Sequence, residues 1–122
     1  MALVGCIHRD PLGVGYLIVD NQTNEQISVS YKLVYYDADT VTVCVLPQTK
    51  DTIYSEVGIG GCFTLGQLKV FEIATCDNPT HVLYKQEPIN ELEWIVDEQS
   101  TKGGFCYYSS NTFVVTDTLL NH

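Results

Sequence analysis

Residues 27 to 46 alternate apolar and polar side chains with a period of two, and this pattern constrains the fold more than any other feature. In its first half the apolar positions are Ile27, Val29, Tyr31, Leu33 and Tyr35. Such alternation is typical of a β-strand with one buried face. Turn residues follow at 37–40, and the alternation resumes from residue 41 until a proline at position 47 ends it. The segment therefore predicts a β-hairpin.

Similar signals predict short strands along the rest of the chain. We expect strands at 14–20, 52–57, 62–65, 67–75 and 81–85, and a last hairpin joining 105–108 to 113–116 around Ser109-Ser110-Asn111. Within 67–75 the apolar phase shifts, which predicts either a strand buried on both faces or a β-bulge. Many short strands with close turns favour a mainly antiparallel barrel or sandwich, because a parallel sheet needs long crossovers.

The segment 88–99 fits two structures. Its apolar residues have helical spacing, acids crowd its first turns, Pro88 stands at its start and Gly103-Gly104 lie beyond its end. A strand through Leu92, Trp94 and Val96 is the alternative. We predict the helix, so the expected fold class is all-β with one short helix near residues 88–99, and the alternative class is α+β. No repeat or linker divides the chain, so we expect one domain, 1–122.

Charge narrows the possible partners. The chain has 15 Asp and Glu against 6 Lys and Arg, a formal net charge of −9. So few basic residues argue against direct binding to nucleic acid or to an anionic membrane surface. Five of the acids fall within 87–98, which contains no base. We expect a docking surface for a basic protein there, with Trp94 or Ile89 as apolar anchor, against the alternative of a solvated helix face. The proposed docking residues are Glu87, Glu91, Glu93, Trp94, Asp97 and Glu98.

Eight tyrosines are many for 122 residues. The pairs Tyr35-Tyr36 and Tyr107-Tyr108 place one ring on each face of a strand. We expect one ring of each pair in the core and the other near the surface, where it can contact a ligand or a partner.

No catalytic or metal-binding motif is complete. Cys6 and His8 share a strand face, and Cys62 with His81 is a second possible nucleophile and base. Zinc requires two ligand pairs and only Cys6-x-His8 comes close, while Asp37 and Asp39 fit a solvated turn better than a cation site. The glycines of 58–61 lack the Lys-Ser/Thr of a phosphate loop. We therefore expect no enzyme, metal or cofactor.

The five cysteines are odd in number and widely spaced, so we interpret them as reduced core residues. The first ten residues lack the basic start of a signal peptide, and no stretch is apolar enough to span a membrane. These observations predict a cytoplasmic protein, in which the sequon Asn21-Gln22-Thr23 is only a polar turn.

Three functions fit these features. The first is a non-enzymatic, acidic interaction or inhibitor domain that docks on a basic protein, as an immunity protein or a viral or phage antagonist of a host factor would. The second is an oligomeric β-domain or β-barrel whose tyrosines enclose a small molecule. The third is a structural subunit, for example of a virion, whose strand edges pair between copies as a homo-oligomer.

Overall fold

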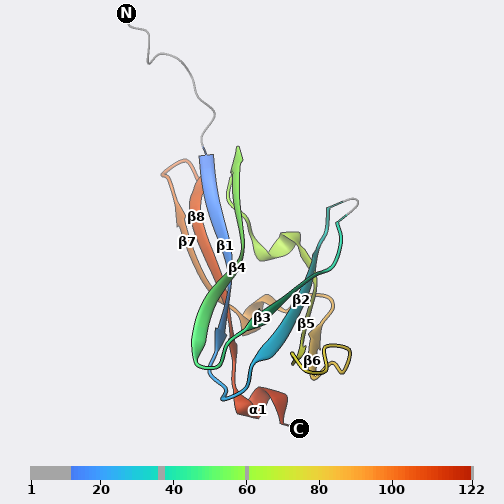
Figure 1. Cartoon of the computed structure of the whole chain (residues 1–122). Coiled ribbons are helices and arrows are strands. Elements are labelled where there is room, and N and C mark those ends of the chain that lie inside the picture. The colour runs from blue at the N-terminus through green and yellow to red at the C-terminus, as the bar shows by residue number, and fades with distance from the viewer. Residues whose placement is uncertain (1–11, 36–37, 60, 122) are drawn as a thin grey trace, which may run out of the picture.

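The computed structural model describes residues 12–35, 38–59 and 61–121, and in them eight strands form two sheets packed face to face (Figure 1). The first sheet has the order β4-β1-β8-β7, and the second has the order β3-β2-β5-β6. Neighbours pair antiparallel except β1 and β8, which are parallel. The predicted all-β class is confirmed, as a sandwich. The strands are β1 (Leu12–Asn21), β2 (Ile27–Leu33), β3 (Val41–Val45), β4 (Thr49–Ile59), β5 (Leu68–Thr75), β6 (Tyr84–Gln86), β7 (Ile95–Ser100) and β8 (Cys106–Val115).

The core lies between the sheets. Every second residue of the central strands points inward, as the alternation predicts for β2, and large aromatic rings from both sheets meet there. Phe71 of β5 and Phe113 of β8 have ring centroids 5.0 Å apart. The fully buried apolar side chains are Leu17, Val19, Ile27, Val29, Val45, Phe63, Phe71, Ile73 and Val115.

The segment that follows β4 crosses the inner face of β1 instead of forming the strand predicted at 62–65. It lies so close to β1 that a Cβ at Gly15 would come 2.5 Å from the backbone nitrogen of Phe63, and one at Gly13 would come 2.5 Å from the carbonyl carbon of Gly61. The segment ends in a 3₁₀ turn, η1 (Leu65–Gln67). The close packing of this segment therefore requires glycine at both positions of β1.

Of the two alternatives expected for 67–75, the structure shows the β-bulge: Lys32 pairs with Val70 and Leu33 with Leu68, which leaves one extra residue on β5. The predicted hairpin of 105–116 is wrong, because β8 runs through its expected turn. Ser109 and Asn111 are buried there. The Ser109 hydroxyl donates to the carbonyl oxygen of Phe63, and the Asn111 amide donates to that of Tyr16 at 3.1 Å. Those bonds remove the cost of burying two turn-forming side chains.

The helix predicted at 88–99 is reduced to one 3₁₀ turn, η2 (Glu91–Glu93), and the segment continues as β7. The strand alternative is therefore correct from Ile95 onward. A short α-helix, α1 (Asp117–Leu120), lies instead after β8, where we expected a strand end. The hydroxyl of Thr116 accepts from the backbone N–H of Leu119 and starts it. None of the described helices is long and apolar enough to cross a bilayer.

Four of the five cysteines form disulfides, so their interpretation as reduced core residues is wrong. Cys44 bonds to Cys76 and Cys62 bonds to Cys106, with Cα atoms 6.1 Å and 5.6 Å apart. Both separations lie within the range of ordinary disulfides. Cys6 lies outside the described residues. The wide spacing of the cysteines concealed this pairing, because each bond joins segments that are distant in sequence.

Candidate functional site

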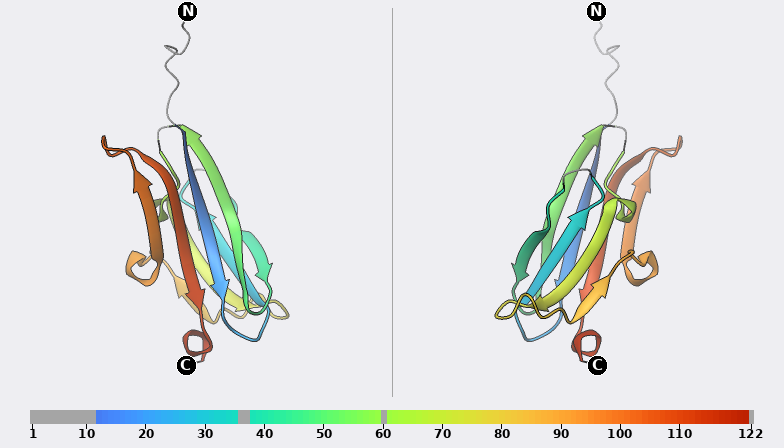
Figure 2. Two further views of the ribbon diagram at one scale, coloured as in Figure 1. Left: turned by 90° about the vertical axis from the view of Figure 1, so that its left-hand side faces the viewer. Right: turned by 90° about the vertical axis from the view of Figure 1, so that its right-hand side faces the viewer.

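The strand β7 is one of the two edge strands of the first sheet (Figure 2). All six of its residues are exposed. Among the described strands it pairs only with β8. Opposite it, the second sheet ends in β6, which has three residues and does not extend across β7. Both faces and one backbone edge of β7 are therefore open, and an open edge can accept a further strand.

Two carboxylates of β7 lie on its opposite faces. Glu98 pairs with Ser109, whose side chain points to the interior, and Asp97 pairs with Ser110, which points outward. Glu91 precedes them on η2. Within the part of the chain that the structure describes, the side chains of Glu91, Asp97 and Glu98 make no hydrogen bond or ion pair. All three residues are exposed, so their charges are available to a partner.

The other two acids of the predicted docking surface, Glu87 and Glu93, form bonds with other residues of this chain. Glu87 pairs with Lys85 at 3.2 Å, and the same lysine lies 3.7 Å from Glu72. Both carboxylates raise the pKa of Lys85, the bond to Glu87 most. Glu93 accepts from the hydroxyl of Tyr84 and, at 3.0 Å, from the amide of Gln86. Burial and the bond to Glu93 raise the pKa of Tyr84. The acidic cluster therefore divides into two acids that are bonded within the protein and three that have no side-chain bond to described residues.

Trp94 is only 6% exposed, so its predicted role as a surface anchor is wrong. Its ring packs against Phe71 and Phe113, with centroids 4.8 Å and 4.9 Å apart. Its indole N–H donates to the buried amide oxygen of Gln86 at 3.0 Å. The same oxygen accepts from the backbone of Asn90, and the amide nitrogen of Gln86 donates to Tyr84 and Glu93. This fully bonded glutamine attaches the start of β7 to β6.

Three apolar residues beside the free acids are exposed instead. Leu92 is 94% exposed on η2, and Ile95 and Val96 begin β7. Ile89, the second expected anchor, is half-buried and packs against the core. The sequence did not identify these positions, because which of several apolar residues in 88–99 faces solvent depends on how the segment crosses between the sheets.

The tyrosines predicted to line a ligand site do not converge. Tyr35, just after β2, donates to Glu56 of β4 at 2.9 Å. Tyr107 and Tyr108 lie on β8 in the first sheet, where the Tyr108 ring lies 5.9 Å from that of Tyr16. Tyr36 lies outside the described residues. A surface pocket of about 320 Å³ is lined by other residues, at the ends of β2 and β5: Glu25, Gln26, Thr75, Cys76 and Asp77.

The described residues among the catalytic and metal candidates do not form the sites that the sequence suggested. Cys62 is bonded to Cys106, which leaves no thiol for His81 to activate, and His81 is exposed before β6. Cys6, His8, Asp37 and His122 lie outside the described residues, and Asp39 is exposed. Asn21, of the sequon, is fully buried and donates to the carbonyl oxygens of Glu25, Val45 and Leu46. Its amide is therefore committed to the turn.

Comparison with protein-family models, with curated proteins and with solved structures finds no match to this chain. The open edge β7, with its free carboxylates and exposed apolar residues, is therefore the candidate functional site on geometric grounds alone.

Proposed function

We propose that this chain is a non-enzymatic interaction domain that binds an extended, basic segment of another protein by strand addition to β7. The observation that carries the proposal is a six-residue edge strand, exposed on both faces, that presents two free carboxylates. Backbone hydrogen bonds from the edge would supply affinity, and side chains on alternate faces would supply specificity. An inhibitor of a basic protein is one kind of molecule that such a site suits.

The other edges are less suited to strand addition. The edge strand β6 has three residues, and β3 has five and continues through a tight connection into β4. The edge strand β4 contains an extra residue, Ile53, between the pairs formed by Leu17 and Ile18. Short and bulged edges resist pairing. In the register of β7 with β8, the extra residue is Tyr107 on β8, so β7 itself is regular.

Charge favours a basic partner over a second copy of the chain. Antiparallel pairing of two β7 strands about their middle would place the carboxylates of Asp97 and Glu98 against those of the other copy. Like charges directly opposite each other destabilise a strand pair. Two consecutive lysine or arginine residues of a partner strand would instead point to opposite faces, where one would meet Asp97 and the other Glu98.

The disulfides indicate the redox environment in which the domain folds. The sequence predicts a cytoplasmic protein, because it shows neither a signal peptide nor a transmembrane segment. Two disulfides within the described residues support an oxidising environment for the folded domain.

The test measures, by fluorescence anisotropy, binding of a short dye-labelled peptide in which pairs of consecutive lysines are separated by valines, so that lysines point to both faces of the added strand. We expect binding that weakens steeply as salt rises through about 0.1 M, where the screening length is roughly 10 Å. The double variant Asp97→Lys/Glu98→Lys should weaken it by about tenfold or more, because it turns several attractions of up to about 1 kcal/mol into repulsions. The matched control is Asp51→Lys on β4, which should change affinity less than the β7 variant.

Two further peptides separate strand addition from charge attraction alone. In one peptide every odd-numbered residue is N-methylated, and in the other every even-numbered residue. One set of methyl groups replaces the N–H groups that face β7, and the other set replaces only the N–H groups that face solvent. We expect one methylated peptide to lose binding and the other to keep it. Equal binding of both, or equal loss in the β4 control, would contradict the proposal.

A further inference from the structure

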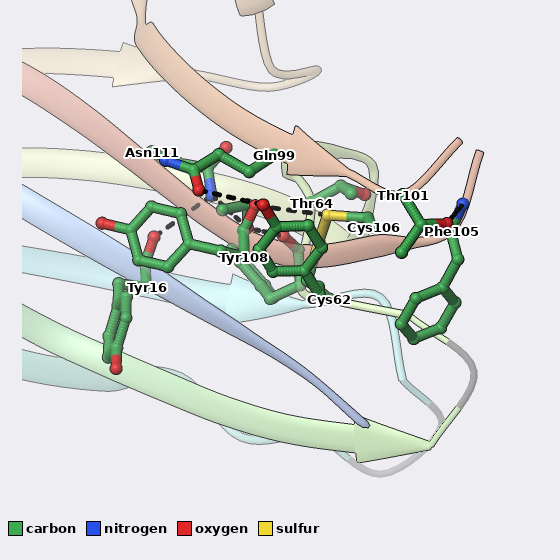
Figure 3. The surroundings of a disulfide bond; sticks show 12 residues. Tyr16, Cys62, Thr64, Gln99, Thr101, Phe105, Cys106, Tyr108 and Asn111 are labelled. Carbon is green, nitrogen blue, oxygen red and sulfur yellow. Dashed lines mark hydrogen bonds between the residues drawn. A yellow bond between two sulfur atoms is a disulfide. The ribbon is translucent and has the colours of Figure 1, made fainter. Parts of the chain in front are cut away.

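The disulfide Cys62–Cys106 lies at the end of the sandwich where β7 and β8 meet the segment after β4 (Figure 3). The carboxylate of Glu98 lies beside it. The two sulfur atoms and one carboxylate oxygen all lie within 4.8 Å of one another. Each of the three groups comes from a different segment: Cys62 from the crossing segment, Glu98 from β7 and Cys106 from β8. Such a group is a possible ligand set for a metal ion when the sulfurs are not bonded to each other.

We propose that Cys62, Cys106 and Glu98 form a zinc site when a thiol reductant opens this disulfide. Two electrons from a dithiol reduce the S–S bond, the dithiol becomes a disulfide, and two protons complete the cysteine thiols. Binding of Zn²⁺ then displaces both protons and leaves two thiolates and one carboxylate on the ion. Water would occupy the fourth position of a tetrahedral site.

The spacing of the backbone fits this ligand set. Two thiolates at about 2.3 Å from a tetrahedral zinc ion lie roughly 3.8 Å apart, and a carboxylate oxygen lies about 3.6 Å from each sulfur. The Cα atoms of the two cysteines are 5.6 Å apart, so side-chain rotation alone can separate the sulfurs that far. Since the carboxylate oxygen already lies within 4.8 Å of both sulfurs, it needs to move only by about 1 Å.

Access and hydrogen bonding also permit binding. Glu98 is exposed and both cysteines are half-buried, so an ion can reach the group from solvent. Glu98 makes no hydrogen bond or ion pair with other described residues that would compete for its carboxylate. The second disulfide provides an internal contrast: among the described residues, no third ligand forms such a group with Cys44 and Cys76.

Cobalt provides the test, because thiolate ligands give Co²⁺ a charge-transfer band in the near ultraviolet and tetrahedral ligands give it visible bands. The variant Cys6→Ser/Cys44→Ser/Cys76→Ser retains only Cys62 and Cys106, and Cys6→Ser/Cys62→Ser/Cys106→Ser retains only the other pair. We expect the first variant to bind one Co²⁺ after reduction and none when oxidised, and Zn²⁺ to displace the cobalt. The second variant should show no comparable band.

Glu98→Gln in the first variant should weaken cobalt binding by about tenfold or more, because it removes a direct ligand. Glu91→Gln is the matched control, exposed on the same segment but outside the ligand group, and should leave binding unchanged. Absence of the band in the reduced protein, an equal band with the other cysteine pair, or an unchanged affinity in Glu98→Gln would overturn the proposal.

Circular dichroism keeps the test decisive if the reduced variant loses its fold. In that case Zn²⁺ should restore the spectrum of the oxidised protein, and failure to restore it would contradict the site. The experiment uses the metal alone, so its result is independent of peptide binding at β7.

Discussion

The two edge strands of the first sheet, β4 and β7, meet solvent in opposite ways. The bulge in β4 directs Ile53 toward the core, and the carboxylate of Glu56 on β4 accepts hydrogen bonds from the hydroxyls of Tyr54, at 2.6 Å, and Tyr35, at 2.9 Å. Gln67 on η1 donates to the hydroxyl of Tyr35. These bonds connect β4 to the second sheet and close the sandwich on that side.

On the β7 side the connection between the sheets ends at Trp94. Beyond it Asp97 and Glu98 have no partner among the described residues, whereas Glu56 has two tyrosines. Both edges carry carboxylates, so the presence of acids does not distinguish an open edge, such as β7, from a sealed edge, such as β4, whose Glu56 accepts hydrogen bonds from within the protein. The difference lies in whether the fold supplies donors to those acids, and that depends on contacts between distant segments.

The largest effect on stability is expected at Trp94, the buried residue that directly precedes β7. Trp94→Ala removes a ring that packs on Phe71 and Phe113 and leaves Gln86 without one donor. Truncation of a buried aromatic residue costs about 3–5 kcal/mol of unfolding free energy. Urea unfolding measures this loss. Leu92→Ala is the matched control, because that side chain is 94% exposed two residues earlier, and it should change stability by less than about 0.5 kcal/mol. Similar losses in the two variants would show that Trp94 does not anchor this side.

A smaller effect is expected from breaking the sealed edge. Glu56→Gln removes the charged acceptor shared by Tyr35 and Tyr54, and we expect a loss of about 1–2 kcal/mol, since hydrogen bonds to charged groups contribute somewhat more than neutral ones. Hydrogen exchange should also become faster along β4 and stay unchanged along β7. Glu91→Gln changes an acid whose side chain makes no hydrogen bond or ion pair with the described residues, so it should leave both stability and exchange unaltered. An equal effect of the two substitutions would remove the distinction between the edges.

The sequence predicted the fold class and the regular strands because period-two alternation is a local property of each strand. It succeeded for β2 and β3 and for the bulge near Leu68. It failed at Ser109 and Asn111, where polar residues typical of a turn continue a strand. Their bonding partners, Phe63 and Tyr16, are distant in sequence, and no local pattern reveals them.

The sequence located the acidic segment of the candidate site, but it did not show which residues of that segment are available to a partner. The acids of 87–98 lie close together in sequence, yet Glu87 and Glu93 bind residues of β6. Asp97 and Glu98 have no side-chain bond to the described residues. The helix and strand patterns of this segment are both present in its sequence. Burial of Trp94 between two rings from different sheets determines the outcome, and that contact forms only in the folded molecule.

The smallest expected effect is a pH dependence of the unfolding free energy that comes from the tyrosines at the β4 edge. Burial, followed by the hydrogen bond to Glu56 and its charge, raises the pKa of Tyr54 well above the ordinary value of 10.0, and the same causes raise that of Tyr35. The unfolded chain therefore loses these protons first, so the stability of the sealed edge is complete below pH 10 and decreases as the pH rises beyond it. Tyr54→Phe removes one of the ionising groups, and its unfolding free energy should decrease less between pH 9 and pH 11 than that of the natural sequence. Urea unfolding at each pH measures both slopes, and Tyr107→Phe, on an exposed ring beside the open edge, is the control. A slope that Tyr54→Phe leaves unchanged would show that the bond between Tyr54 and Glu56 does not seal β4.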